Sequence, residues 1–208
     1  MPDLSLEQWV ETEFGVTFVA GLDEAGRGAI AGPVVAAAVI LPLDRPEIRQ
    51  QLAQVNDSKQ LTPARREATF DLIAAYALTT GVGRSSAVEI DRLGIMAANR
   101  LAMRRAIAQL DPVPQFLLLD GRMRLPAVYL PQRAIVRGDT RSLSIAAASI
   151  LAKVSRDREM IALDDRYPVY GLRYHKGYCT RAHEAALAAH GPCPIHRHSF
   201  APIRRPLL

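Results

Sequence analysis

Four acidic residues fall at or just beyond the ends of predicted strands, and this placement suggests metal chemistry. Asp23 and Glu24 follow one apolar stretch, Asp120 closes the run Phe-Leu-Leu-Leu-Asp, and Asp139 follows a further short apolar stretch. Neighbouring strands would bring these carboxylates to one edge of a sheet, where they cannot all ionise without a cation. Hard oxygen ligands of this kind suit Mg²⁺ or Mn²⁺. Any one of these acids alone could equally be a loop cap or a surface residue.

The run Gly-Leu-Asp-Glu-Ala-Gly-Arg-Gly at residues 21–28 places two of these acids beside a phosphate-compatible loop. Gly26 and Gly28 let the backbone approach a ligand closely, and Arg27 adds positive charge. The spacing Gly26-x-Gly28-x-x-Ala31 also matches a loose dinucleotide-binding fingerprint. That alternative requires a helix after the loop, whereas residues 33–41 read as a strand. The two acids would also face the pyrophosphate.

The elements that must position these residues alternate between strands and helices. We predict strands at 16–22, 33–41, 76–83, 116–119 and 133–136. We predict helices at 4–13, 63–75, 86–110, 144–163 and 181–190, with the first one outside the main core, and a loop at 56–61. Thr62, Ser86 and Thr180 are suitable N-caps for three of the helices. This order predicts an α/β fold with a mixed sheet and helices packed on it.

Charge is distributed unevenly along the 208 residues. The net charge is +5, but the first 24 residues carry −6, which leaves +11 for the rest. From Arg166 to the C-terminus there are seven basic residues and one acidic residue, Glu184. A basic C-terminal face suggests a polyanionic partner, although a solvated surface would have the same composition. Only three lysines occur, at positions 59, 153 and 176.

Several classes of protein are excluded by composition. No apolar run reaches the roughly 18–20 residues that a membrane-spanning helix needs. The acidic N-terminus has neither the basic nor the apolar region of a signal peptide. Two cysteines, Cys179 and Cys193, could form one disulfide at most, which is not typical of a secreted disulfide-rich scaffold. We therefore expect a cytoplasmic protein that does not associate with membranes.

Taken together, seven segments resemble the type 2 ribonuclease H family, the bacterial ribonuclease HII group. They are GLDEAGRGAIAGPVVAAAVIL (21–41), NDSKQL (56–61), LLLDG (117–121), RGD (137–139), IAAASILAKVSRD (145–157), YGLRYHKGYCT (170–180) and HRHSF (196–200). The resemblance implies an RNase H-like fold, with a mixed five-stranded sheet, flanking helices and a C-terminal helical extension. It also implies a short N-terminal extension over residues 1–16 and a type 2 RNase H domain over residues 17–208.

The same resemblance implies a metal-dependent endoribonuclease. Its substrates would be RNA–DNA hybrids and duplex DNA that contains single ribonucleotides, cleaved on the 5′ side of the ribonucleotide. Two divalent ions, Mg²⁺ or Mn²⁺, would generate 5′-phosphate and 3′-hydroxyl ends. We expect the protein to be a monomer.

Matching the family residue by residue gives a set of expected site residues. The catalytic and metal-binding carboxylates would be Asp23, Glu24, Asp120 and Asp139, with Asp23 bridging the two ions. The substrate-binding residues would be Gly26, Arg27, Gly28, Asn56, Ser58, Lys59, Ser149, Lys153 and Tyr178. Tyr178 matches the tyrosine that reads the RNA–DNA junction, and Gly26–Gly28 matches the motif that touches the ribonucleotide. The chain departs from the family at Cys179 and His198, neither of which is among the four acids.

Three alternatives remain open at this stage. Cys193, His196 and His198 could form half of a zinc site, although no second ligand pair has suitable spacing. The basic C-terminal face could belong to a nucleic-acid-binding protein without catalytic activity. A nuclease of the same fold could instead act on another substrate, such as a DNA junction.

Overall fold

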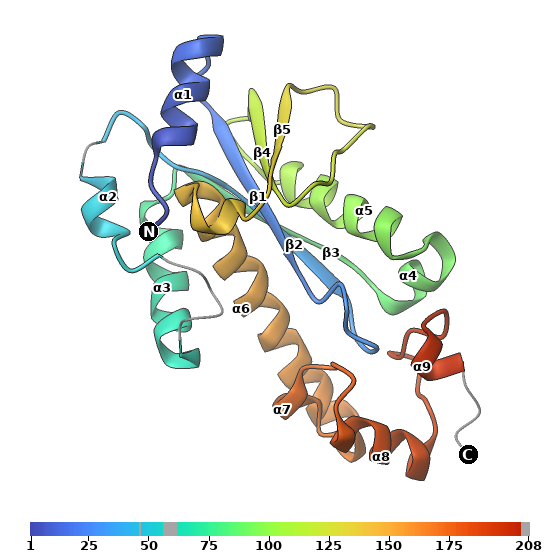
Figure 1. Cartoon of the computed structure of the whole chain (residues 1–208). Helices are drawn as coiled ribbons and strands as arrows, with labels where there is room; N and C mark the ends of the chain where they lie inside the picture. The colour runs from blue at the N-terminus through green and yellow to red at the C-terminus, as the bar shows by residue number, and fades with distance from the viewer. Residues whose placement is uncertain (46, 56–61, 205–208) are drawn as a thin grey trace.

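The computed structural model describes residues 1–45, 47–55 and 62–204, and a mixed five-stranded sheet forms its centre (Figure 1). The strand order is β3-β2-β1-β4-β5. The strands are β1 (Val19–Ala25), β2 (Val34–Ile40), β3 (Thr79–Ser85), β4 (Phe116–Asp120) and β5 (Gln132–Ile135). β1, β2 and β3 are antiparallel neighbours, whereas β1, β4 and β5 run parallel. This arrangement confirms the predicted α/β fold with a mixed sheet of five strands.

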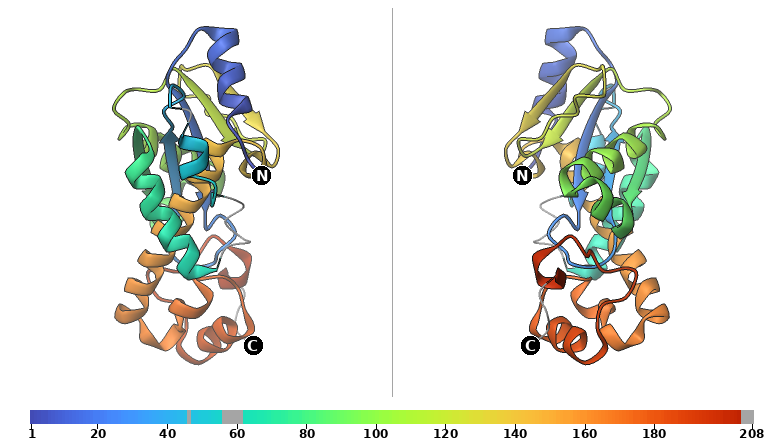
Figure 2. Two further views of the ribbon diagram at one scale, coloured as in Figure 1. Left: turned by 90° about the vertical axis from the view of Figure 1, so that its left-hand side faces the viewer. Right: turned by 90° about the vertical axis from the view of Figure 1, so that its right-hand side faces the viewer.

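Helices cover both faces of the sheet and extend beyond one end of it (Figures 1 and 2). They are α1 (Ser5–Phe14), α2 (Ile48–Gln51), α3 (Pro63–Tyr76), α4 (Ala87–Leu93), α5 (Ile95–Ile107), α6 (Leu143–Arg166), α7 (Leu172–His175), α8 (Arg181–His190) and α9 (Ala201–Arg204). Two short 3₁₀ turns, η1 (Gly138–Thr140) and η2 (Pro168–Tyr170), flank α6. The C-terminal elements α7, α8 and α9 form the group beyond the sheet, as the predicted helical extension requires. In the described ranges, none of the helices has the length and apolar character needed to cross a membrane.

Strand β2 is buried on both faces because its side chains alternate between two helical layers. Ala37 and Val39 pack with α6, whereas Ala36, Ala38 and Ile40 pack with α5. All seven residues of β2 are buried, which explains why the strand is a continuous run of Val, Ala and Ile. The same alternation in the neighbouring strand β1 decides which way the acidic residues point.

Strand β1 differs from the prediction in a way that matters for the site. It was expected to end at residue 22, but its pairing with β2 continues through Asp23 and Glu24 to Ala25. The two acids are therefore strand residues and do not follow the strand. β3 likewise begins and ends later than predicted, because its pairing with β2 sets its limits. The predicted loop at 56–61 lies outside the described residues.

The predicted helix over residues 86–110 is two helices, α4 and α5. Ser86 and Glu89 form the expected capping box at the start of α4. Gly94 then adopts a φ of 77°, a conformation that favours glycine, and it serves as the C-cap of α4 and the N-cap of α5. The chain therefore turns between two short helices where the apolar spacing suggested one long helix.

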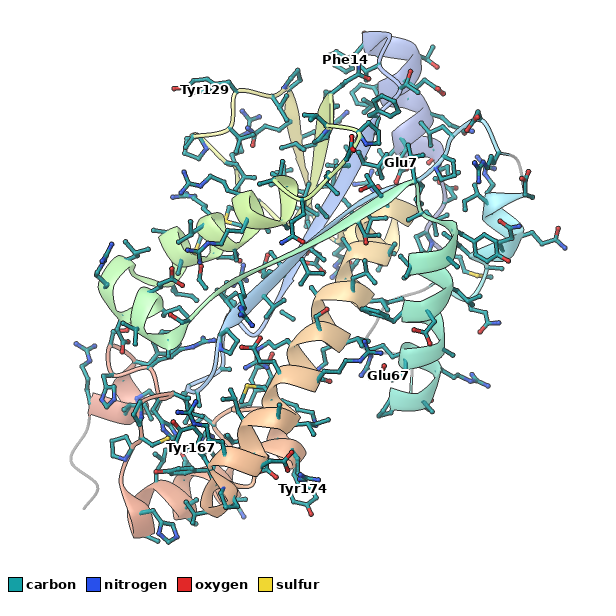
Figure 3. The ribbon with its side chains drawn as sticks, turned by 180° about the vertical axis from the view of Figure 1, so that it is seen from behind. Glu7, Phe14, Glu67, Tyr129, Tyr167 and Tyr174 are labelled. Atoms are coloured by element: carbon teal, nitrogen blue, oxygen red, sulfur yellow. The ribbon has the colours of Figure 1, made fainter. Side chains whose placement is uncertain are left out.

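Helix α1 packs against the core, contrary to the expectation that it lies outside it. Val10 is fully buried and packs with Val19 and Phe116. Glu7 is also fully buried and lies where α1 meets the start of α6 (Figure 3). Glu7 and Val10 are three residues apart and share one face of α1, so this face is held by tertiary contacts. The boundary at residue 16 between an extension and a domain remains a prediction.

The N-terminal segment also completes the first turn of α6. Leu143 N–H donates to the Asp3 carbonyl at 2.8 Å, and Ser144 N–H donates to Glu7 Oε1 at 2.9 Å. The hydroxyls of Ser142 and Ser144 each donate to the same oxygen at 2.6 Å. These contacts satisfy amides that a helix leaves without partners at its start.

Candidate active site

Sheet topology brings the acids of two parallel strands together. Leu22 of β1 pairs with Leu119 of β4, so the next residues along the two strands are Asp23 and Asp120. Asp139 lies in the 3₁₀ turn η1, which follows β5 at the same edge. The backbone N–H of Gly138 donates to Asp120 Oδ1 at 2.7 Å and ties this turn to the end of β4.

Asp23 and Glu24 point to opposite faces of the sheet because consecutive strand residues alternate. On the α6 side, Ser149 donates a hydrogen bond to Asp23. On the α5 side, Asn99 donates one to Glu24, and Arg27 forms an ion pair with Glu24 at 2.9 Å. Each acid is therefore oriented by a different helix.

Burial raises the pKa of both adjacent acids. Asp23 is 8% exposed, and burial raises its pKa well above the usual value, with the charges of Glu24 and Asp120 adding to the effect. Burial also raises the pKa of Glu24, partly offset by the charge of Arg27. Carboxylates crowded in this way favour the binding of a cation, since a cation restores their ionised form.

One pocket of about 440 Å³ gathers every predicted site residue that the structure describes. Its lining includes Asp23, Glu24, Gly26, Arg27, Gly28, Asp120, Asp139, Ser149, Lys153 and Tyr178. The remaining three predicted residues, Asn56, Ser58 and Lys59, lie outside the described residues. The pocket therefore unites residues from β1, β4, η1, α6 and the segment before α8.

The donor set of this pocket fits a hard divalent cation. All four acids supply oxygen ligands, which Mg²⁺ and Mn²⁺ prefer. Within the part of the chain that the structure describes, no three His, Cys, Asp or Glu side chains already stand in metal-binding geometry, so the fit rests on the oxygen donors and on the burial of Asp23 and Glu24. Asp23 makes no ion pair among the described residues, so no basic side chain takes the place of a cation beside it.

Two buried arginines hold the loop after β1 from behind. Arg197 donates to the carbonyls of Gly26, Arg27 and Gly32 at 2.8–3.0 Å. Arg156 donates to the carbonyls of Ala31 and Pro33 at 3.2 and 3.0 Å. Gly26 has a φ of 87°, and a Cβ there would lie 1.9 Å from Arg156 Nε, so no larger residue fits.

The segment that carries Tyr178 is joined directly to this loop. The backbone N–H groups of Ile30 and Ala31 both donate to the Gly177 carbonyl, at 2.9 and 3.2 Å. The Tyr178 ring is 40% exposed and lies 5.4 Å from the Arg156 guanidinium carbon. Its exposed ring therefore borders the pocket while its backbone is fixed to the loop.

The histidines of the C-terminal region form a hydrogen-bonded cluster. His183 Nδ1 bonds the Tyr178 carbonyl at 3.0 Å, and His183 Nε2 faces His196 Nε2 at 3.0 Å. His196 Nδ1 accepts from the Cys193 backbone N–H at 3.0 Å. Since the Tyr178 carbonyl can only accept, His183 carries its proton on Nδ1 and His196 on Nε2. Both ring nitrogens of His196 are thus engaged in hydrogen bonds within this cluster, and among the described residues no group of His, Cys, Asp and Glu side chains supports the zinc-site alternative.

The basic C-terminal face is less available than its composition suggests. The Arg173 guanidinium binds both Asp164 and Asp165. Arg197 is completely buried. These two arginines therefore support the fold and leave less free positive charge on this face for a polyanion.

Sequence reasoning missed Asn99, Arg156 and Arg197 as parts of the site. A signal existed for each in the sequence: Asn99 interrupts an apolar stretch of the predicted helix over 86–110, and Arg156 and Arg197 lie within the segments 145–157 and 196–200 that carry the family resemblance. All three are fully buried in the structure. A buried amide or guanidinium requires partners, which here are Glu24 and the backbone carbonyls of the loop. Which partners they meet is not evident from spacing along the chain.

Comparison with known proteins agrees with this geometry. The family model described as Ribonuclease HII matches residues 20–203. A curated Ribonuclease HII from Nitrosococcus oceani is 54% identical over 187 residues, covering 90% of each chain. Another, from Chloroflexus aurantiacus, is 51% identical and covers 100% of this chain and 97% of its own. The crystal structure of ribonuclease H2 from Pyrococcus horikoshii has a TM-score of 0.75 at 27% identity, covering 90% of this chain and 95% of that one. Both the sequence and the arrangement of the sheet and its acids therefore show that the chain belongs to the ribonuclease HII family.

Proposed function

We propose that the pocket around Asp23 is where this chain performs its family's reaction. Members of the ribonuclease HII family are divalent-metal-dependent endonucleases that cleave RNA in RNA–DNA hybrids. The observation that carries the proposal is the pocket of about 440 Å³ in which four acids from three parts of the sheet edge lie beside a glycine-rich loop. Asp23, Glu24, Asp120 and Asp139 are the proposed catalytic and metal-binding residues.

The residues around the acids would hold them ready for metal. Two bound divalent ions, Mg²⁺ or Mn²⁺, would supply an activated water and stabilise the leaving 3′ oxygen. Ser149 orients Asp23, Asn99 orients Glu24, and the Gly138 N–H orients Asp120. Asp23, whose carboxyl feels the charges of both Glu24 and Asp120, is the proposed shared ligand. The products would carry 5′-phosphate and 3′-hydroxyl ends.

Selection of a ribonucleotide would depend on the loop and the tyrosine. Gly28 has no atom within 4 Å of where a Cβ would stand, which leaves open space beside its backbone for a sugar. Close backbone contact with a 2′-hydroxyl distinguishes RNA from DNA. The exposed ring of Tyr178 would stack on the deoxyribose that follows, so that single ribonucleotides in duplex DNA are cut on their 5′ side.

We further propose that the protein acts as a monomer and that it is located in the cytoplasm. All ten described site residues that the family match predicts line this one pocket, so a single copy of the chain supplies them. Size-exclusion chromatography with light scattering would test the oligomeric state.

Cleavage assays with four labelled substrates test the proposed function. They are duplex DNA with one ribonucleotide, a continuous RNA–DNA hybrid, all-DNA duplex and a four-way DNA junction. With Mg²⁺ or Mn²⁺ we expect the first two to be cut and the last two to stay intact. EDTA should abolish cleavage, and end-labelling should map the cut to the 5′ side of the single ribonucleotide.

The variant Asp120→Asn assigns the reaction to this pocket. Loss of a metal ligand worth several kcal/mol should reduce turnover about 100-fold or more while duplex binding persists. Glu13→Gln, on the exposed side of α1, is the matched control and should behave as wild type. Near-normal turnover of Asp120→Asn at ordinary Mg²⁺ would refute the assignment, and cleavage of the junction would favour a different nuclease.

A further inference from the structure

A second depression adjoins the pocket of about 440 Å³ around the four acids, which we call the carboxylate pocket. Three of the arginines that line this depression lie outside the family-like segments and have no role in the proposed mechanism. The depression has a volume of about 900 Å³ and shares Glu24, Arg27 and Asp120 with the carboxylate pocket. Its remaining charged residues are all basic, namely Arg100, Arg122 and Arg124. We call the surface formed by these three arginines the basic groove. It opens directly onto two of the four acids.

The charges of the basic groove are not neutralised within the described chain. None of its three arginines lies within 4 Å of a carboxylate among the described residues. By contrast, Arg27 forms an ion pair with Glu24, and Arg105, which follows Arg100 in α5, forms one with Glu89. A cluster of unpaired guanidinium groups favours a polyanion, and their planar donors suit phosphate oxygens.

The groove is built by elements that already hold the acids. Arg122 and Arg124 stand in the connection that leaves β4 immediately after Asp120, and Arg100 belongs to α5. Arg100 Nε donates to the Arg124 carbonyl at 3.2 Å, which joins the two elements. A strand bound at the acids would therefore meet these arginines at a fixed position.

The residues that line the two depressions also define the direction in which a bound strand would cross them. Ser149, Lys153 and Tyr178 line only the carboxylate pocket, whereas the three arginines line only the groove. The shared residues Glu24, Arg27 and Asp120 lie between the two sets. A strand that crosses the acids thus has Tyr178 on one side and the groove on the other.

We propose that the basic groove binds backbone phosphates of the cleaved strand on the 5′ side of the cut. This inference rests on the proposed function, in which Tyr178 contacts the nucleotide that follows the ribonucleotide on the 3′ side. The groove then receives the preceding nucleotides. Its positive charge would offset the repulsion between the strand and the four acids.

Binding assays with one-sided duplexes test this proposal. Each duplex contains one ribonucleotide and has either a long 5′ flank and a short 3′ flank, or the reverse. Affinity is measured in EDTA, so that no cleavage occurs, over a range of salt concentrations. The test variant is Arg122→Gln with Arg124→Gln. The control is Arg92→Gln with Arg104→Gln, two exposed arginines of α4 and α5 that do not line the groove.

On the duplex with the long 5′ flank, the test variant should bind about tenfold more weakly, with a log–log salt slope lower by roughly 0.7–0.9 per lost phosphate contact. On the duplex with the long 3′ flank, it should bind as the control does. Circular dichroism and thermal melting establish that both variants are folded. An unchanged slope on both duplexes would overturn the groove as a nucleic-acid site, and a loss confined to the long 3′ flank would overturn its direction.

The wild-type enzyme separates this proposal from the one it rests on. If wild type fails to cut the single-ribonucleotide duplex with Mg²⁺, the proposed function is wrong whatever the groove binds. If wild type cuts normally and the variants differ as stated, both proposals stand. If wild type cuts normally and all variants bind alike, only the groove is refuted.

Discussion

At the scale of single residues, the adjacent acids Asp23 and Glu24 have different surroundings because successive side chains of β1 point to opposite faces of the sheet. Asp23 faces Ser149 on α6, and Glu24 faces Asn99 on α5 and Arg27. Burial raises the pKa of both, but only Glu24 has an ion pair among the described residues. Without a bound cation, ionisation of Asp23 therefore costs more free energy than ionisation of Glu24.

This cost predicts that Asp23→Asn stabilises the metal-free protein. A carboxyl whose pKa is raised in the folded state binds more protons there than in the unfolded state, so stability falls as pH rises through the folded pKa. At pH 7 without divalent ions, the variant should melt a few degrees higher, since about 1 kcal/mol shifts the Tm of a domain this size by roughly 2–4 °C. The difference should shrink as the pH falls toward the unfolded-state pKa of about 3.9.

Differential scanning calorimetry from pH 4 to 8 measures this effect. Asp71→Asn, which removes an exposed acid of α3, is the control and should leave Tm unchanged. Addition of Mg²⁺ should raise the Tm of wild type more than that of Asp23→Asn. A variant that melts lower than wild type throughout would show that the carboxylate is not strained by its burial.

Tyr178→Ala should change substrate preference more than overall activity. Stacking of an aromatic ring is worth about 1–3 kcal/mol, so cleavage at a single ribonucleotide should fall roughly 10- to 100-fold. Cleavage of a continuous RNA–DNA hybrid should fall much less, because a 2′-hydroxyl on the following sugar would crowd the ring. Tyr174→Ala, 84% exposed in the same region (Figure 3), is the matched control. Equal losses on both substrates would make Tyr178 a structural residue only.

At the scale of elements, the N-terminus of α6 depends on a segment more than 130 residues earlier in the chain. Glu7 Oε1 accepts from two serine hydroxyls and one amide, while its Oε2 is buried without a partner among the described residues. Burial raises the pKa of Glu7, opposed by these hydrogen bonds. The start of α6 favours the anion, because a helix N-terminus carries partial positive charge. The turn that bears Asp139 lies directly before this cap.

Replacing Glu7 should therefore destabilise both the fold and the metal site. Glu7→Ala leaves buried donors of Ser142 and Ser144 unsatisfied and should cost about 2–4 kcal/mol in urea unfolding. Glu7→Gln, which retains an acceptor, should cost less. Both should raise the Mg²⁺ concentration needed for half-maximal cleavage, and the amides of residues 143–145 should exchange faster with solvent. Glu13→Ala on the same helix is the control, and an equal effect there would refute a specific role for Glu7.

At the scale of the whole molecule, the C-terminal region is fastened to the sheet by buried guanidinium groups. Arg197, near the end of the described chain, bonds carbonyls of Gly26, Arg27 and Gly32. Its burial and the nearby charge of Arg156 lower its pKa to about 9. A bridge between Ala31 and His196 adds a backbone connection. The carbonyls of Gly26 and Arg27 are thereby occupied by Arg197, a residue that does not line the pocket.

Arg197→Met should consequently loosen the loop that approaches the ribonucleotide. Hydrogen bonds from a charged donor contribute about 1.5–3 kcal/mol, and the loss should appear as a similar or greater fall in unfolding free energy. The ratio of affinities for ribonucleotide-containing and all-DNA duplexes, measured in EDTA, should also fall. Arg204→Met, exposed in the same C-terminal segment, is the control. If stability falls but the affinity ratio does not, Arg197 supports the fold without positioning the loop.

The chain's local patterns determined its family, its mixed sheet and the set of residues that line the carboxylate pocket. Apolar alternation and short motifs are local properties, so they can be recognised without knowledge of contacts. The same local information failed at Gly94, where one predicted helix is two, and at Asp23 and Glu24, which continue a strand because β2 pairs with them.

Only the tertiary structure decided how the pocket is supported and what adjoins it. Asn99 beneath Glu24, Glu7 at the start of α6 and Arg197 behind Gly26 each act across a long stretch of sequence. The arginines of the basic groove come from α5 and the connection after β4, and they share no motif. A buried polar group must find partners, but the packing of distant elements selects those partners, and no spacing along the chain encodes that choice.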